Sequence, residues 1–170
     1  KLLKSIYGDR ICFLVAGDFY EGNPISISRD YIEKLHSSEI IQYIGWRDDI
    51  FNLLGLSDIV VLPSYYREGV PTILLQAMAM EKPIITTNAP GCREVLEDGR
   101  NGFLVPVKNS AALSDKMEIL INDKEKRVSF GRQGRVMALE HFEISKIVEL
   151  YIKLYRTLIL KKSLQFVVQV

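Results

Sequence analysis

The chain has 170 residues and a mass of 19.4 kDa, which is room for one domain with a sizeable hydrophobic core. Apolar residues make up 48%, and Lys plus Arg number 22 against 21 for Asp plus Glu, which excludes a disordered chain and argues against a dedicated nucleic-acid binder. No apolar run approaches the roughly 18 residues of a membrane span. Cys12 and Cys92 lack the spacing of zinc ligands. We therefore expect a globular protein of the reducing cytoplasm.

Short apolar runs alternate with helical patterns along the first two thirds of the chain. Strands are predicted over residues 11–16, 40–44, 59–62, 83–87 and 103–105, and helices over residues 30–36, 48–56, 72–80, 93–96 and 110–121. The strand runs are continuously apolar, which is typical of strands covered on both faces. This order predicts a Rossmann-like α/β domain with a doubly wound parallel sheet.

The last third of the chain has a helical pattern throughout. Residues 124–142 are helical and charged, and from Ile144 onward apolar residues recur at the spacing of one helix face. Such a stripe is usually core packing, although Lys161 and Lys162 keep a membrane-surface helix open as an alternative. We place the domain at residues 1–160 and a tail at residues 161–170, which has no predicted partner.

Ligands of open α/β sheets bind outside the carboxyl ends of the strands. The segments that follow the predicted strands are residues 17–19, 45–49, 64–72 and 88–94. In the second of these, Asp48 and Asp49 are adjacent rather than spaced, so we expect them to cap the following helix rather than to bind a cation. The third and most informative segment leads from a strand into a helix.

The segment from Ser64 to residue 80 combines groups that suit a phosphorylated ligand. Gly69 lets a ligand approach the backbone closely, and Pro71 fits the first turn of a helix. The amides that would face a bound diphosphate are those of Val70, Thr72 and Ile73. Glu68 suits the hydroxyls of a sugar, or positive charge that develops on its ring. Gln76, one helical turn beyond Thr72, could reach a ribose on the same side.

Three stretches together resemble a known family. Residues 45–50 read Gly-Trp-Arg-Asp-Asp-Ile, residues 68–79 read Glu-Gly-Val-Pro-Thr-Ile-Leu-Leu-Gln-Ala-Met-Ala, and residues 90–102 read Pro-Gly-Cys-Arg-Glu-Val-Leu-Glu-Asp-Gly-Arg-Asn-Gly. In order and spacing they resemble retaining nucleotide-sugar glycosyltransferases with two Rossmann-like domains, the B-type fold. The resemblance is to the large bacterial family that builds capsule, lipopolysaccharide and other envelope polysaccharides, and it extends over residues 11–155.

The resemblance implies a role for each matching residue. Glu68 begins the family's Glu-x7-Glu motif and is the catalytic carboxylate expected beside the donor sugar, while Gln76 stands where the second glutamate holds the ribose. Gln can still accept a hydrogen bond, but its charge is gone. The other implied donor-binding residues are Ser64, then Gly45, Trp46, Arg47 and Asp49 in or near the loop whose backbone meets the nucleobase, and Gly69, Val70, Pro71 and Thr72, whose amides face the phosphates.

Further expectations follow from the same resemblance. Family members need no metal and no cofactor besides the nucleotide-sugar substrate, of which UDP-sugars are favoured here. Glu81 stands where relatives place the glycine that ends a helix in the left-handed conformation. The Arg and Lys that clamp the diphosphate, and the acceptor-binding N-terminal domain, are expected outside this chain. The helix 144–160 is expected to cross back toward that domain.

The resemblance thus implies the C-terminal, donor-binding half of a hexosyl- or N-acetylhexosaminyltransferase, inactive by itself. Its acceptor would be a glycan or lipid-linked saccharide, and its location the cytoplasm, with peripheral association with the inner membrane face left open. Two alternatives remain: a nucleotide-sugar-binding module without catalysis, which Gln76 favours, and a nucleotide-sugar epimerase of the same architecture. His36 and His141, the two histidines, fall in helical patterns away from strand ends, which counts against the epimerase.

Overall fold

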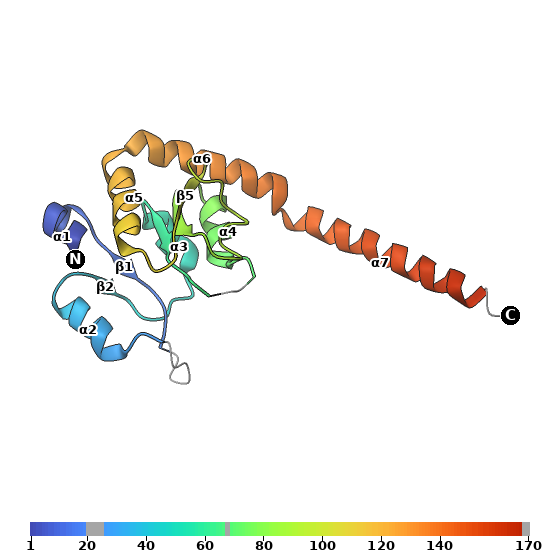
Figure 1. The fold of residues 1–170 in the computed structure, drawn as a ribbon, viewed down its shortest axis with the longest axis horizontal. Coiled ribbons are helices and arrows are strands. Elements are labelled where there is room, and N and C mark those ends of the chain that lie inside the picture. Colours follow the sequence, from blue (N-terminus) through green and yellow to red (C-terminus); the bar gives the residue numbers. More distant parts are fainter. Residues whose placement is uncertain (20–25, 67–68, 168–170) are drawn as a thin grey trace.

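The computed structural model describes residues 1–19, 26–66 and 69–167. Its central sheet is parallel and has the order β3-β4-β5, formed by Val60–Leu62, Ile84–Thr87 and Gly102–Val105 (Figure 1). A second parallel sheet pairs β1 (Leu14–Val15) with β2 (Gln42–Tyr43). The helices that alternate with these strands are α2 (Arg29–Ser37), α3 (Ile50–Leu56) and α4 (Thr72–Ala79). The predicted parallel α/β architecture is therefore confirmed.

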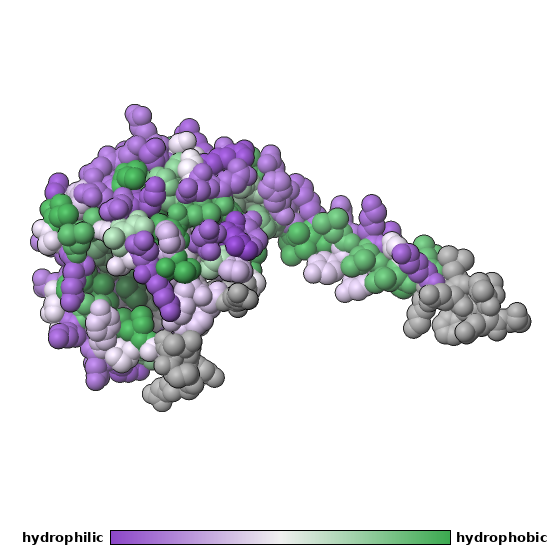
Figure 2. Space-filling model, in the orientation of Figure 1, coloured by the Kyte–Doolittle hydropathy of each residue, from purple (hydrophilic) through white to green (hydrophobic). Residues whose placement is uncertain are grey.

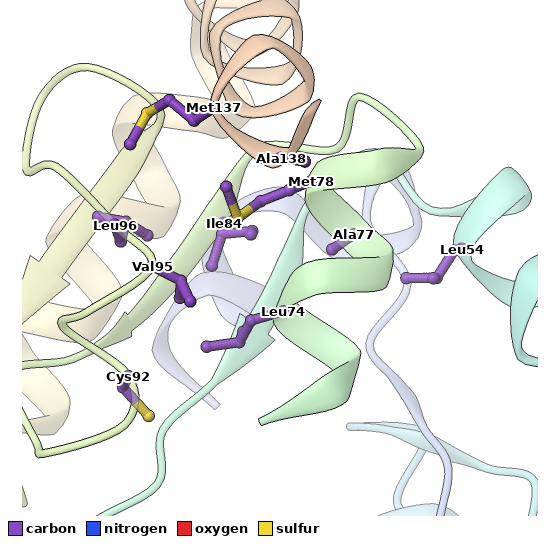
Figure 3. Close-up of a cluster of buried hydrophobic side chains, with 10 residues drawn as sticks. All are labelled: Leu54, Leu74, Ala77, Met78, Ile84, Cys92, Val95, Leu96, Met137 and Ala138. Atoms are coloured by element: carbon purple, nitrogen blue, oxygen red, sulfur yellow. The ribbon is translucent and has the colours of Figure 1, made fainter. Parts of the chain in front are cut away.

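Helices cover both faces of the central sheet, and its middle strand places one isoleucine on each face. Ile84 packs in one cluster with α3, α4 and α6 (Lys124–His141), as Figure 3 shows, whereas Ile85 packs in another with α5 (Ser110–Asn122) and Phe130 of α6. Neighbouring residues of a strand point to opposite faces, so these two clusters lie on opposite sides of the sheet. All four residues of β4 are buried, as expected for a doubly covered parallel strand.

Two sequence predictions about elements are wrong. The strands predicted over residues 11–16 and 40–44 shrink to two residues each, and Leu14 is 41% exposed, so these strands are not covered on both faces. The helix predicted over residues 93–96 is a series of turns. Gly91 there has a φ of 90°, which an α-helix does not allow, and the buried Asn101 side chain accepts from Glu97 N at 2.8 Å and donates to Val95 O.

The C-terminal end of α4 is fixed by a left-handed turn. The amide of Lys82 donates to Ala77 O at 2.9 Å, and that of Glu81 to Met78 O at 3.1 Å, the two hydrogen bonds of a Schellman motif. Glu81 has a φ of 56°, so the expectation of a left-handed residue here is confirmed although the side chain is not glycine. Arg135 of α6 donates to Ala79 O at 2.7 Å and ties α6 to this helix end.

The chain begins with α1 (Leu2–Tyr7), which packs beside α5, and continues into the short 3-10 helix η1 (Gly8–Arg10). Tyr7 links α1 to α5, because its hydroxyl donates to Glu118 at 3.0 Å and accepts from the Asn122 amide. At the other end, α7 (Ile144–Val167) projects away from the domain (Figure 1). It continues past residue 160, so the predicted tail at 161–170 does not begin at a structural boundary.

The prediction that the α7 stripe packs in the core is wrong within the described chain. Most of its apolar side chains are exposed, between 43% for Ile152 and 74% for Ile144, and Figure 2 shows apolar surface along the projecting helix. The pattern correctly predicts the helix but not its burial. Among the described residues, no helix has both the length and the hydropathy that crossing a membrane requires.

Candidate functional site

The three strands of the central sheet end side by side, and hydrogen bonds join the strand ends to one another and to the segments that follow. Thr86 Oγ1 donates to Leu62 O at 2.8 Å, and Thr87 Oγ1 donates to Ser64 O. On the other side of β4, the amide of Asn88 donates to Val105 O at 2.9 Å. The segment that starts at Ser64 is thereby held against the end of β4, at the edge where a ligand is expected.

Helix α4 begins directly after this segment, and its N-cap residue supplies no side-chain cap. The helix starts at Thr72, as predicted, because Pro71 is extended (φ −64°, ψ 121°) and stands at the N-cap position. Proline has no side-chain oxygen with which to cap the first amides. Gly69, Val70 and Thr72 are exposed around this helix end. The geometry suits an anion, which would accept from backbone amides and meet the positive end of the helix dipole.

Gln76 lies four residues after Thr72 in α4 and is half-buried. Residues four apart share a helix face, so its amide can reach a group that contacts the first turn. Glu68, the predicted catalytic carboxylate, lies outside the described residues, as does Arg67. The role of Glu68 stays a prediction.

The loop between β2 and α3 carries the other group of predicted site residues. Gly45 has a φ of 68°, and Trp46 after it is 68% exposed. Arg47 and Asp49 form a bidentate pair, with Nε to Oδ1 at 2.8 Å and Nη2 to Oδ2 at 2.7 Å. Asp49 stands at the N-cap of α3, but its side chain makes no capping hydrogen bond, so that part of the prediction is wrong. The Arg47 hydrogen bonds lower the pKa of Asp49.

This loop is joined to the segment that follows β1. The amide of Gly17 donates to Gly45 O at 2.9 Å, and the Tyr43 hydroxyl donates to Gly17 O at 2.9 Å. The structure therefore brings the predicted residues together in two groups. Gly45, Trp46, Arg47 and Asp49 lie at the end of the β1-β2 sheet, and the other predicted residues that the structure describes lie at the end of the β3-β4-β5 sheet.

Lys108 is a residue at this edge that the sequence reasoning missed. Its ammonium lies 4.9 Å from the centroid of the Tyr65 ring, and Tyr65 stacks on Tyr66 with centroids 4.4 Å apart. Lys108 adopts a φ of 58° in the segment after β5. The rule that ligands meet the carboxyl ends of strands could have directed attention to this segment, because it follows the predicted strand at residues 103–105.

Glu94 is a second carboxylate at the edge, after β4. It accepts from the amide of Gly91 at 2.6 Å and pairs with Arg93 at 3.3 Å. Partial desolvation raises the pKa of Glu94, but these hydrogen bonds outweigh it, so the pKa lies below its ordinary value. Glu94 is therefore ionised at neutral pH and holds the turn rather than carrying a proton. Among the described residues, no group of three or more His, Cys, Asp or Glu is arranged to hold a metal ion.

The sequence pattern of the family described as "Glycosyl transferases group 1" matches residues 1–137. The chain belongs to this family. It is 34% identical over 147 residues to the N,N'-diacetylbacillosaminyl-diphospho-undecaprenol alpha-1,3-N-acetylgalactosaminyltransferase of Campylobacter jejuni, which covers 86% of this chain and 37% of that protein. The group 1 chain thus spans well under half the length of this curated relative.

Two solved structures have folds similar to that of this chain. Alr3699/HepE of Anabaena, in a crystal structure with UDP, matches with a TM-score of 0.77 and 24% identity over 86% of this chain and 41% of that one. The C-terminal domain of the group 1 family protein LpcC from Francisella tularensis matches with a TM-score of 0.61 and 28% identity, over 68% of this chain and 64% of that one. The Rossmann-like fold predicted from the sequence is therefore that of known glycosyltransferases.

Proposed function

We propose that the chain is the donor-binding, C-terminal half of a retaining glycosyltransferase that takes its sugar from a UDP-sugar. The observation that carries the proposal is the start of α4 at Thr72, with Pro71 at an uncapped N-terminus directly after the Glu68-Gly69 motif. A nucleoside diphosphate fits this helix end by charge and by hydrogen bonding. The UDP in the Anabaena structure supports the choice of nucleotide.

In this proposal, the residues of the α4 segment divide the work on the donor. The amides of Gly69, Val70 and Thr72 bind the phosphates and stabilise the charge that develops on the departing diphosphate. Glu68 faces the donor sugar, and Gln76 accepts from a ribose hydroxyl. Neither a covalent nucleophile nor a metal ion is required of this chain. The diphosphate-clamping Arg and Lys and the acceptor-binding groups belong to other parts of the enzyme, so transfer requires those parts.

The sugar would pass to a lipid-linked saccharide during synthesis of a cell-envelope polysaccharide, at the cytoplasmic face of the membrane. The Campylobacter relative supports this acceptor class, because its name specifies a diphospho-undecaprenol-linked saccharide. The match to a C-terminal domain from Francisella supports the assignment to the C-terminal half. We further propose that α7, whose apolar face is exposed here, packs on the N-terminal domain of the whole enzyme.

Saturation-transfer NMR of this chain with UDP, GDP and their sugar conjugates tests donor binding, since it detects weak complexes. We expect transfer to UDP and UDP-sugars, and loss of transfer to the sugar protons alone in Glu68→Ala. Glu125→Ala, which removes an exposed carboxylate from α6, is the matched control and should bind as the parent does. Transfer to none of the nucleotides would refute the proposal.

Gln76→Glu probes the ribose contact directly. A carboxylate accepts a stronger hydrogen bond than an amide oxygen, which corresponds to about two- to tenfold tighter UDP binding. Gln76 also favours the second candidate, a donor-binding module without catalysis, because it removes a charge from the motif. Transfer activity of the full-length enzyme that disappears in Glu68→Ala would exclude that candidate.

A further inference from the structure

Lys108 has a backbone conformation that lysine rarely adopts. It is the third residue of a β-turn closed by the Asn109 amide, which donates to Pro106 O at 3.3 Å, and its φ is 58°. Turns with a positive φ at this position favour glycine or asparagine, because a Cβ is strained there. A strained residue of this kind at the ligand edge of a sheet indicates a function for its side chain.

The Lys108 side chain reaches across the end of the central sheet. Lys108 follows β5, whereas Tyr65, whose ring centroid lies 4.9 Å from the ammonium, follows β3, and β4 lies between those two strands. Tyr65 stacks on Tyr66, with the ring centroids 4.4 Å apart. Asn88, which directly follows β4, is exposed as well. One ammonium, two aromatic rings and one amide therefore gather at the same edge of the sheet.

This cluster is accessible to a ligand. Tyr65 and Tyr66 are 39% and 38% exposed, and Lys108 is exposed beside them. Within the part of the chain that the structure describes, Lys108 forms no ion pair with a carboxylate, so its charge is available to an anion. The hydrogen bonds that join the strand ends fix the backbone on both sides of β4, which reduces the entropy that binding would cost.

The chemistry of the cluster suits a sugar that carries a negative charge. Aromatic rings pack against the apolar face of a sugar ring, hydroxyl and amide groups form hydrogen bonds with its hydroxyls, and an ammonium pairs with a phosphate. In the proposed function, the phosphates of the donor bind at the start of α4, directly after β3. Lys108 approaches from β5, two strands away, so we assign its charge to the other saccharide of the reaction.

We propose that Lys108, Tyr65 and Tyr66 bind the sugar phosphate of the acceptor, so that this half of the enzyme adds a contact to those made by the parts outside this chain. The inference rests on the proposed function, in which the acceptor is a lipid-linked saccharide. The acceptor named for the Campylobacter relative joins its sugar to a diphosphate, which is the chemistry expected here.

N-Acetylglucosamine 1-phosphate, which lacks both nucleoside and lipid, is the probe, and an NMR titration of the chain measures its affinity. Lys108→Ala should weaken its binding about three- to tenfold, the range expected for a solvent-accessible charge pair, and Lys108→Arg should retain it. UDP affinity should stay unchanged in Lys108→Ala. Lys116→Ala, which removes an ammonium 4.6 Å from the centroid of Phe103, is the matched control and should leave both affinities unchanged.

A glycine variant separates binding from folding. Lys108→Gly removes the same side chain but relieves the positive φ, so its Tm should lie about 2–4 °C above that of Lys108→Ala, while both variants bind the sugar phosphate equally weakly. Tyr65→Leu, which removes the ring beneath the ammonium, should also weaken binding of the sugar phosphate.

The outcomes distinguish this inference from the proposed function. No binding of the sugar phosphate by the parent chain, or unchanged affinity in both the Ala and the Gly variants, with UDP still bound, would overturn the acceptor contact alone. An equal loss of affinity for UDP in Lys108→Ala would assign the ammonium to the donor phosphates and would also overturn it. Absence of NMR transfer to any nucleotide would refute the proposed function and this inference with it.

Discussion

Replacing either of two buried glycines of α6 by alanine tests how α6 packs on α4. The two replacements should have opposite effects on the stability of the chain. A Cβ added at Gly131 would lie 1.9 Å from Glu81 O and 2.7 Å from Glu81 C, and both of those atoms are backbone. A Cβ added at Gly134 would lie 3.7 Å from Met78 Cα, an ordinary contact. Both replacements by alanine gain about 1 kcal/mol of helix propensity. Only the first must push α6 away from the end of α4, at a cost of about 3 kcal/mol for overpacking.

We therefore expect Gly131→Ala to destabilise the chain by about 2 kcal/mol and Gly134→Ala to stabilise it by up to about 1 kcal/mol. At this chain length, these changes correspond to a Tm about 4–8 °C lower and about 2–4 °C higher, respectively. Urea unfolding followed by circular dichroism measures both variants, and an unchanged m-value shows that the unfolding reaction is the same. Equal free energies of unfolding for the two variants would refute the packing described between α6 and the Glu81 turn.

Three further changes test other parts of the structure. Glu81→Gly relieves a non-glycine residue at φ 56° and should raise the free energy of unfolding by about 1 kcal/mol, measured by the same urea titration; no gain would mean that the turn is unstrained. Asn101→Ala removes both partners that the buried Asn101 side chain provides and should cost about 1–3 kcal/mol, whereas a near-neutral result would show that water replaces them. The pKa of Asp49 lies below 3.8, so the Arg47 pair contributes stability above that pH and loses it as pH falls through the lowered pKa. A ¹³C carboxyl NMR titration should show this pKa moving up toward 3.8 in Arg47→Ala, and an unmoved value would contradict the pairing.

Elements bounded by strong local signals were predictable from the sequence. β4 begins next to Pro83 with two β-branched apolar residues, and α4, α5 and α6 match their predicted ranges to within one or two residues at each end. The end of α4 is a further example. A left-handed residue was predicted there, and Glu81 adopts that conformation although it is not glycine. Local chemistry decides such boundaries, so one sequence suffices to find them.

The wrong predictions share a different cause. Each depends on what the segment contacts in the folded chain, and local sequence patterns do not specify those contacts. Aspartate is a common helix cap, but the Asp49 carboxylate binds Arg47, two residues earlier, and makes no capping hydrogen bond. The turns at residues 93–96 depend on Asn101, a side chain outside the segment. The spacing in α7 gives the apolar face of a helix but carries no information about what lies against that face.

The two parts of the candidate site differ in the same way, because one depends on local sequence and the other on contacts with residues outside the segment. In the proposed function, the phosphates are bound by backbone amides at the start of α4, and the Gly-x-Pro spacing of the motif is enough to predict that helix start. The β2-α3 loop depends on side chains and on a carbonyl contact with Gly17, which no spacing within the loop encodes. The exposure of Trp46 follows from that arrangement. A sequence can therefore suggest a functional loop at this sheet end, but the structure is needed to show that the Arg47–Asp49 pair and the contact with Gly17 fix its backbone.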